Sequence, residues 1–221
     1  MAQMLFTARH GGVSIGNYTS LNLGDHVGDI PEAVVSNRRV LANMLSRIEP
    51  KFMNQVHGNQ VVEVDENSSS QITADAIVTR RVGLPLTVLS ADCLPILVAG
   101  ESVVGAIHAG RKGILNGVIE QTISKMRTLG GNNLSATIGP AICRDCYEVD
   151  LQMYKDVTGI EPALATSLET HCLDLKRAAA NQLSSQSVSV KDLEICTAHD
   201  QNFFSYRRDG STGRNSGVIV L

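Results

Sequence analysis

Apolar residues follow two periods along this chain. Short apolar or alternating runs predict strands at residues 5–8, 52–64, 74–79, 84–91, 103–107, 134–138, 188–197 and 218–221, and Gly58-Asn59 divides the second run into two. Apolar spacing of three and four residues predicts helices at residues 29–48, 115–129 and 173–183. Polar, turn-forming segments separate these elements, among them residues 202–217.

Segment 29–48 carries the clearest helical pattern. Its apolar stripe comprises Val34, Val35, Leu41, Met44, Leu45 and Ile48. Asp29 and Glu32 have capping-box spacing, Pro31 suits a first helical turn, and Pro50 is expected to end the helix. We interpret this helix as part of the scaffold.

The stretch from Leu84 to Gly113 concentrates the reactive residues. Its two apolar runs end at Asp92-Cys93 and at His108, and each reactive residue lies beside a glycine, a proline or a small residue. Sheet proteins commonly build their sites from polar side chains at the ends of apolar strands. We therefore expect the functional site here, with His108 at a strand-to-helix turn.

Composition narrows the class of protein. The chain has 221 residues, 43% of them hydrophobic, and no linker-like segment, so we expect a single domain spanning residues 1–221. The formal net charge of -3 and the lack of a basic stripe argue against nucleic acid as a partner.

The first residues do not resemble a secretory signal, and the apolar run 84–99 is too short and too interrupted for a membrane span. We expect a cytoplasmic protein without a membrane partner, whose five cysteines are free thiols or metal ligands.

One set of Cys and His residues suits a catalytic zinc ion. His57, Cys93 and His108 each lie at a predicted strand end, where side chains from separate strands can converge. Three protein ligands leave the fourth position of zinc open for water or substrate. The ordinary alternative is a buried cysteine and two unrelated histidines.

A second set suits a structural zinc ion. It comprises Cys143-x-x-Cys146, then His171-Cys172, then Cys196-x-x-His199, although the later spacing is not that of a standard finger or ribbon. The alternative is that these thiols pack as small apolar groups around a loop.

Two further segments have features of ligand binding. Gly110-Arg111-Lys112-Gly113 opens a helix directly after His108, where free N–H groups and two cations favour an anion such as phosphate. The alternative there is a solvated basic helix start. The run Phe203 to Arg208 would stack a ring and hold an anion, or else form a strand with core aromatics and surface arginines.

Seven strings in order resemble one family across nearly the whole chain. They are FTARHGGVSIGNYTSLNLGDHVGD, NQVHG, ADAIVT, ADCLP, VGAIHAG, IGPAI with CYEV, and FFSYRRDG with TGR. This sequence resembles the bacterial YfiH/YlmD family, which is related to the human laccase domain-containing protein. The resemblance implies an α/β fold with mixed sheets packed between helices in a single layered domain. It also implies one zinc ion on His57, Cys93 and His108.

The resemblance further implies an activity and its substrates. The family was formerly named polyphenol oxidase or multicopper laccase, and it is now understood as purine nucleoside phosphorylases with adenosine deaminase and methylthioadenosine phosphorylase activity. Some members are described as peptidoglycan editing factors. Copper chemistry is disfavoured, because this chain has six histidines and no His-x-His pair. The partners expected are a nucleoside and phosphate, with the protein a monomer or small homo-oligomer.

Site roles follow as predictions. We assign proton transfer to Asp92 or Glu148, although Asp92 in a regular strand would point to the face opposite Cys93. Substrate and phosphate binding are assigned to Asn54, Gly110, Arg111, Lys112 and Arg207. The family has Trp-Arg after the HAG string, so Arg111 in this chain replaces an aromatic residue while Lys112 keeps a cation.

Two other functions remain open at this point. A metal-free cysteine hydrolase would use Cys93 as nucleophile and His108 as base. A non-catalytic envelope- or peptidoglycan-related protein would bind a macromolecule through the surface around FFSYRRDG, Phe203 to Gly210.

Overall fold

The computed structural model describes residues 2–45, 47–69 and 71–221. The described strands form two sheets. The smaller sheet has the order β1-β9-β4 and consists of β1 (Gln3–Phe6), β9 (Asn215–Val220) and β4 (Leu86–Ser90). The larger sheet has the order β2-β3-β6-β5-β7-β8 and consists of β2 (Val61–Glu63), β3 (Ala76–Thr79), β6 (Val104–Ala109), β5 (Leu94–Ala99), β7 (Ser135–Ile138) and β8 (Ser189–Asp192). The pairs β2·β3 and β7·β8 are parallel and the others antiparallel, so the sheet is mixed.

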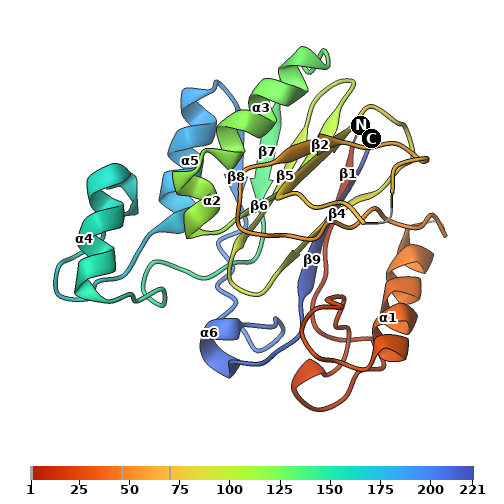
Figure 1. The fold of residues 1–221 in the computed structure, drawn as a ribbon, viewed down its shortest axis with the longest axis horizontal. Coiled ribbons are helices and arrows are strands. Elements are labelled where there is room, and N and C mark those ends of the chain that lie inside the picture. The colour runs from red at the N-terminus through yellow and green to blue at the C-terminus, as the bar shows by residue number, and fades with distance from the viewer. Residues whose placement is uncertain (1, 46, 70) are drawn as a thin grey trace.

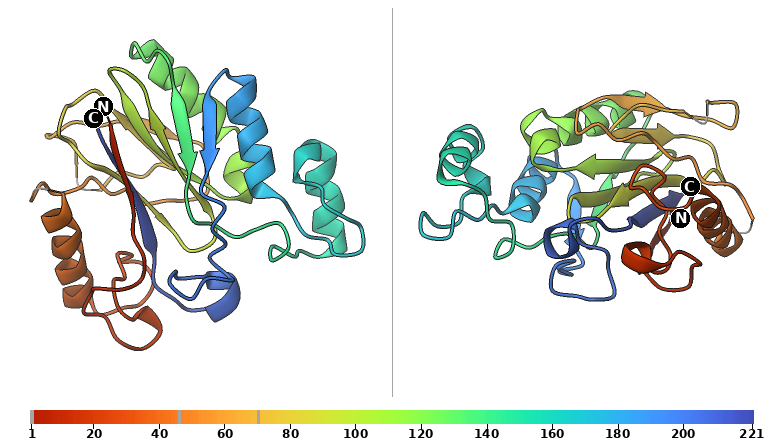
Figure 2. Two further views of the ribbon diagram at one scale, coloured as in Figure 1. Left: turned by 180° about the vertical axis from the view of Figure 1, so that it is seen from behind. Right: turned by 60° about the horizontal axis from the view of Figure 1, so that its bottom comes forward.

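Helices cover the outer faces of the two sheets. The described helices are α1 (Pro31–Met44), α2 (Arg111–Leu115), α3 (Val118–Thr128), α4 (Leu151–Ile160), α5 (Leu175–Ser185) and α6 (Tyr206–Asp209), with single 3-10 turns at Gly16–Tyr18 and Pro162–Leu164. Helix α1 lies on the small sheet, and α3 and α5 lie on the far face of the large sheet, whereas α4 and α6 lie away from these faces (Figures 1 and 2). The two termini lie side by side because β1 pairs with β9, the last strand. No helix of the described residues is long and apolar enough to cross a bilayer.

Side chains that point alternately to the two faces of each strand produce the layers of helices and sheets. In β5, Ile96 and Val98 face the helices, whereas Leu97 packs toward the small sheet. In β9, Ile219 faces the large sheet and Val218 faces α1. Successive side chains of a strand point to opposite faces, so each sheet contributes to two apolar layers. The mixed α/β fold with sheets packed between helices, expected from the resemblance, is confirmed.

Several predicted elements are confirmed with small shifts at their ends. The runs at 74–79, 84–91, 103–107 and 134–138 form β3, β4, β6 and β7, and the helix predicted at 173–183 is α5. The apolar face predicted for 115–129 is buried at Val118, Ile119, Thr122 and Met126. However, Gly117 has a φ of 77° and divides this segment into α2 and α3. A left-handed residue cannot continue a right-handed helix.

The prediction missed strand β5, the central partner of β6 and β7. A proline near the start is uncommon in a central strand, because proline cannot donate to a sheet ladder. In the structure Pro95 is the second residue of β5, whereas the ladder to β7 begins at Ile96. The carbonyl of Pro95 still accepts a hydrogen bond from Gly139 N at 2.9 Å. Thus proline is tolerated at the start of a central strand.

The helix predicted at 29–48 is shorter than expected and buries a different face. It runs from Pro31 to Met44, and Val35 and Met44 are exposed although both were placed on the apolar stripe. The buried face instead includes Asn37, whose amide donates to Ser14 Oγ at 2.8 Å. The Asp29 capping box is also wrong, because the N-cap is Ile30 and makes no side-chain cap. Ser46, within the predicted span, lies outside the described residues.

Other local predictions were wrong for similar reasons. Residues 52–57 form one isolated bridge, at Asn54, and a bend where a strand was expected. The strand predicted at 188–197 is limited to β8. Segment 202–217 was expected to be a loop but contains α6 and the beginning of β9. Helix α4 was missed because it buries only Tyr154 and Val157, which make too weak a stripe to detect.

Candidate functional site

Three side chains from separate segments meet at the ends of the central strands β5 and β6 of the large sheet. His57 lies in a turn before β2, Cys93 lies between β4 and β5, and His108 is buried in β6. Their possible ligand atoms all lie within 4.8 Å of one another. Cys93 Sγ is 3.8 Å from His57 Nε2, and the two imidazole rings meet edge to face with centroids 4.7 Å apart. The structure therefore brings together the set that the sequence singled out as zinc ligands.

A buried carboxylate, Asp75, organises two of the three residues. Asp75 Oδ1 lies 2.8 Å from His108 Nδ1 and accepts the His57 backbone N–H at 2.9 Å. Asp75 Oδ2 accepts the N–H groups of Val56 at 3.2 Å and Gly58 at 2.7 Å. With Nδ1 of His108 donating to this carboxylate, Nε2 keeps its lone pair for a ligand or proton.

This carboxylate also stabilises an unfavourable backbone conformation. His57 has a φ of 59°, which costs a non-glycine residue about 1–2 kcal/mol. The three N–H groups that converge on Asp75 hold the turn in that conformation. Sequence reasoning missed Asp75, although an acidic residue just before the apolar run of β3 was a usable signal.

Without a bound metal ion, Cys93 and His108 shift each other's pKa strongly and in opposite directions. Burial alone would raise the pKa of the Cys93 thiol, but the charge of His108 and hydrogen bonds from both imidazoles lower it to about 6. Burial likewise disfavours the charged form of His108, yet Cys93 and Asp75 raise its pKa to about 9. Between these two pKa values Cys93 and His108 form a thiolate–imidazolium pair.

Gly110 allows the backbone to approach the cluster closely. A Cβ atom at this position would lie 2.8 Å from Cys93 Sγ and 3.2 Å from His57 Cδ2. Only glycine fits there without displacing one of these side chains. Gly110 is also the N-cap of α2, the helix start predicted to bind phosphate.

The other residues of that helix start do not line the cavity beside His57, Cys93 and His108. Helix α2 has only five residues, Lys112 is exposed, and Arg111 Nε is buried without a hydrogen-bond partner among the described residues. Neither Arg111 nor Lys112 lines the cavity beside the cluster.

That cavity has a volume of about 520 Å³, within the range of small-molecule sites. Its wall combines the cluster with apolar, aromatic and cationic side chains. The lining residues are His26, Gln55, His57, Leu89, Ser90, Ala91, Asp92, Cys93, His108, Ile142, Tyr147, Leu175, Tyr206, Arg207 and Arg214.

Two arginines contribute positive charge to the cavity wall. The Arg207 guanidinium lies over the Tyr147 ring, 5.4 Å from its centroid. Arg214 is largely buried, which lowers its pKa from the ordinary value. Burial, together with the charge of Arg214, also lowers the pKa of His26. Arg207 was predicted to bind substrate, whereas His26 and Arg214 were missed, although both lie in the strings that carry the family resemblance.

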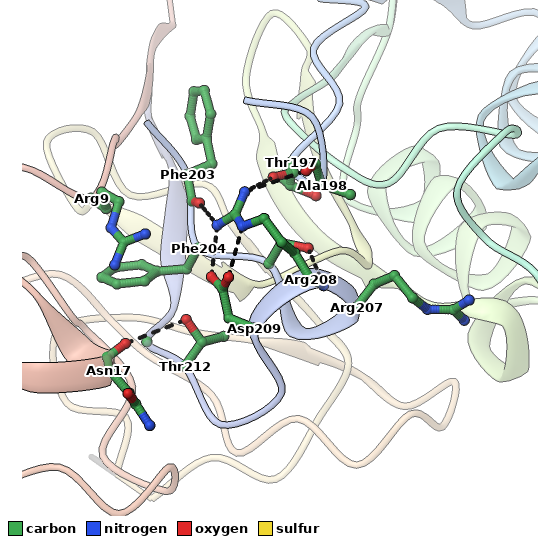
Figure 3. Close-up of polar contacts among 12 residues, drawn as sticks. Arg9, Asn17, Thr197, Ala198, Phe203, Phe204, Arg207, Arg208, Asp209 and Thr212 are labelled. Atoms are coloured by element: carbon green, nitrogen blue, oxygen red, sulfur yellow. Dashed lines mark hydrogen bonds and ion pairs between the residues drawn. The ribbon is translucent and has the colours of Figure 1, made fainter. Parts of the chain in front are cut away.

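The run from Phe203 to Arg208 divides between two roles. Phe203 and Phe204 are buried, Tyr206 and Arg207 line the cavity, and Arg208 binds backbone carbonyls and Asp209 (Figure 3). The alternative of a strand with surface arginines is wrong, because the segment enters the short helix α6.

The two predicted proton-transfer residues lie in different places. Asp92 has a φ of 99° in the bend between β4 and β5, so the regular-strand geometry assumed for it is wrong. Its carboxylate lines the cavity and accepts hydrogen bonds from Thr197 Oγ1 and Arg207 N, both at 2.6 Å. Glu148 and the substrate-binding candidate Asn54 are exposed and do not line the cavity.

The second Cys and His set is also partly assembled. Cys143, Cys146, Cys196 and His199 lie together, with their possible ligand atoms within 4.8 Å of one another. Cys172 is instead buried near Asp145 O at 3.7 Å.

Comparisons with known proteins agree with the fold and the motifs. Residues 3–221 match the family model described as multi-copper polyphenol oxidoreductase laccase. A purine nucleoside phosphorylase of Corynebacterium glutamicum is 42% identical over 98% of this chain and 93% of its own length. One of Streptomyces griseus is 42% identical over 100% of this chain and 94% of its own length.

Solved structures of similar proteins share the whole fold. A Neisseria meningitidis protein of the DUF152 family matches with a TM-score of 0.91 and 35% identity, over 100% of this chain and 94% of that one. YlmD of Geobacillus stearothermophilus matches with a TM-score of 0.85 and 31% identity, over 99% of this chain and 91% of that one. The chain therefore belongs to the laccase-domain family that includes YfiH and YlmD.

Proposed function

We propose that this protein is a zinc-dependent purine nucleoside phosphorylase that also cleaves methylthioadenosine and deaminates adenosine. The observation that carries the proposal is the convergence of His57, Cys93 and His108 in the wall of a cavity that also contains two arginines. The names of the relatives from Corynebacterium and Streptomyces support phosphorolysis. The deaminase and methylthioadenosine activities come from the family resemblance.

The donor set fits zinc. Two imidazoles and a thiolate are zinc ligands, and three protein donors are typical of a catalytic zinc with an open position. The Asp75–His108 pair is the carboxylate–histidine arrangement that orients a ligating imidazole. When bound, zinc supplies a Lewis acid and lowers the pKa of a water in its open position to about 7. Multicopper oxidation, which the family description suggests, needs more histidine ligands than this cluster provides.

The cavity wall has side chains suited to both reactants of a nucleoside phosphorolysis, the phosphate and the purine nucleoside. This reaction breaks the C1′–N9 bond, forms a C1′–O bond to phosphate, and leaves the purine with the bonding electrons and a proton to gain. We assign phosphate to Arg207 and Arg214, because they are the arginines of the cavity wall. The rings of Tyr147 and Tyr206 offer faces for stacking a purine.

Deamination requires a group that moves protons near the reacting carbon. Of the two predicted carboxylates, Asp92 lines the cavity and Glu148 does not. Both oxygens of Asp92 already accept hydrogen bonds, so its position is fixed by Thr197 and the start of α6. We therefore propose Asp92 for proton transfer in place of Glu148.

One observation favours a different enzyme class. The thiolate–imidazolium pair of Cys93 and His108 is the form in which a metal-free cysteine hydrolase would be active. Metal content separates the two functions, because zinc bound to the Cys93 thiolate would protect it from alkylation. The non-catalytic alternative predicts no turnover of any nucleoside.

The test combines metal analysis with a nucleoside panel. Purified protein is assayed on adenosine, inosine, guanosine and methylthioadenosine, with and without phosphate, while free base and inosine are measured. We expect His57→Ala, Cys93→Ala and His108→Ala to lose zinc from this site and activity, and His10→Ala, which changes an exposed histidine bonded to Asn202, to keep both. Full activity in all three cluster variants would rule out the proposal.

A further inference from the structure

We propose that Cys143, Cys146, Cys196 and His199 form a second, closed zinc site that clamps two loops beside the cavity. The proposal does not depend on the function of the first site. Its basis is that four side chains from two distant segments direct three sulfur atoms and one imidazole into one small volume. All four possible ligand atoms lie within 4.8 Å of one another.

The two ligand pairs lie on adjacent turns. The Cys143–Cys146 turn is closed by a hydrogen bond from Cys146 N to Cys143 O at 3.2 Å. The Cys196–His199 turn is followed by one from Asp200 N to Cys196 O at 2.9 Å. Each turn therefore presents its two donors on the same side.

A short parallel bridge sets these turns side by side. Ala141 pairs with Cys196, with hydrogen bonds from Ala141 N to Ile195 O at 3.2 Å and from Thr197 N to Ala141 O at 3.1 Å. The backbone N–H of Cys143 points at Cys196 Sγ, at 3.3 Å. Amide donors directed at sulfur stabilise a thiolate, which is the form that binds metal.

The distances suit a tetrahedral ion. Two sulfur ligands at 2.3 Å from zinc lie about 3.8 Å apart, and a sulfur and a nitrogen ligand lie somewhat closer. Cys146 Sγ and His199 Nε2 are 3.0 Å apart, so small side-chain movements would bring the four donors to this geometry. Because all four positions would be filled by protein, the ion would have no open position for substrate and its role would be structural.

The clamp would act on the cavity. The first turn lies between Ile142 and Tyr147, both of which line the cavity. In the second turn, Thr197 donates to Asp92, which also lines the cavity and whose carbonyl accepts a hydrogen bond from Ile142 N at 3.0 Å. Holding the two turns together therefore fixes cavity-lining side chains that contact either turn.

Arg208 extends this connection to α6. Its guanidinium donates to Thr197 O and Phe203 O, both at 2.8 Å, and pairs with Asp209 (Figure 3). Arg207, the preceding residue, lies over Tyr147. The second turn, α6 and the Tyr147 loop thus form one connected unit, and the proposed zinc site joins its two ends.

The test counts zinc in the purified protein and its variants under reducing conditions. We expect Cys146→Ser and Cys196→Ser each to lose one zinc ion per chain relative to the unchanged protein. Cys172→Ser is the matched control, because this thiol is buried beside the same loop but lies outside the four-residue group, and it should keep all zinc. His199→Cys should also keep it, since four thiolates bind zinc equally well.

Cobalt substitution and mass measurement cover the case in which a serine variant does not fold. The unchanged protein reconstituted with cobalt should show the visible absorption of a tetrahedral cobalt–thiolate centre. His57→Ala should keep the absorption of the Cys143/Cys146/Cys196/His199 site, and the double variant His57→Ala/Cys196→Ser should lose it. If His57→Ala keeps the zinc ion of the Cys143/Cys146/Cys196/His199 site and Cys196→Ser loses it, the second site is supported even if the first site holds no metal. Unchanged zinc content in folded Cys146→Ser and Cys196→Ser would overturn the proposal. A native mass lower by two hydrogens, showing a disulfide between these cysteines, would also overturn it.

Discussion

Replacing Asp75 with asparagine tests whether this buried carboxylate organises the proposed zinc site. The side chain is fully buried and its two oxygens serve four nitrogen atoms. Asparagine has nearly the same shape, but one oxygen becomes an NH₂ group that can only donate. Each of its two orientations therefore disrupts a different part of the site.

If the NH₂ group replaces Oδ2, it faces the N–H groups of Val56 and Gly58, and the His57 turn loses two of its three anchors. If it replaces Oδ1, it faces Nδ1 of His108, which must then accept, so the imidazole proton moves to Nε2. A ligating nitrogen is lost in that tautomer. Both outcomes weaken metal binding.

The magnitude follows from the hydrogen bonds that the substitution removes. Hydrogen bonds to a charged group contribute about 1.5–3 kcal/mol each, so losing two of them costs about 3–6 kcal/mol of unfolding free energy. Mutation of residues that orient metal ligands lowers metal affinity about 10–100-fold. We expect Asp75→Asn to show both effects.

Zinc affinity is measured by competition with a chelator, and stability by chemical denaturation. Asp156→Asn is the control, because Asp156 is exposed on α4 and, within the described part of the chain, its side chain accepts a hydrogen bond only from Gln152 on the same helix. If folded Asp75→Asn bound zinc as tightly as the unchanged protein, the assignment of Asp75 as the organising residue would be wrong.

Three further predictions concern the same cavity. Gly110→Ala should reduce zinc affinity at least about tenfold, because its Cβ would lie 2.8 Å from Cys93 Sγ, whereas Gly159→Ala, which meets open space, should have no effect in the same chelator titration. In metal-free protein, the rate of Cys93 alkylation by iodoacetamide should rise through about pH 6, because His108 lowers the pKa of this thiol; a midpoint near that of an ordinary thiol would contradict the polarised pair. Arg207→Ala should raise the KM for phosphate about tenfold or more while leaving adenosine deamination intact, and equal losses in both reactions would exclude a phosphate-specific role.

The sequence was largely sufficient to predict which residues of the site carry its chemistry. His57, Cys93 and His108 stood at the ends of apolar runs or beside glycine, and the motifs around them identified the family. Cysteine and histidine are residue types whose chemistry is evident without coordinates. In the same way, the C-x-x-C spacing of Cys143 and Cys146 marked the second cluster.

The residues that support the site lie in recognisable strings of the sequence, but their roles could not be assigned from it. Asp75 stands before an ordinary strand, and only folding places its carboxylate under the His57 turn and against His108. His26 and Arg214 are far apart in sequence and meet only because the N-terminal loops pack beside the segment leading into β9. Such roles depend on long-range contacts, which local patterns do not encode.

The sequence by itself therefore determined the strand and helix periods, the family and the reactive atoms, because these depend on local spacing and residue chemistry. Only the tertiary structure decided that Pro95 begins a central strand, that α1 buries Asn37, and which four of the later Cys and His residues converge. The physical reason is that burial and convergence are set by partners distant along the chain. A side chain's neighbours across two sheets cannot be deduced from its neighbours in sequence.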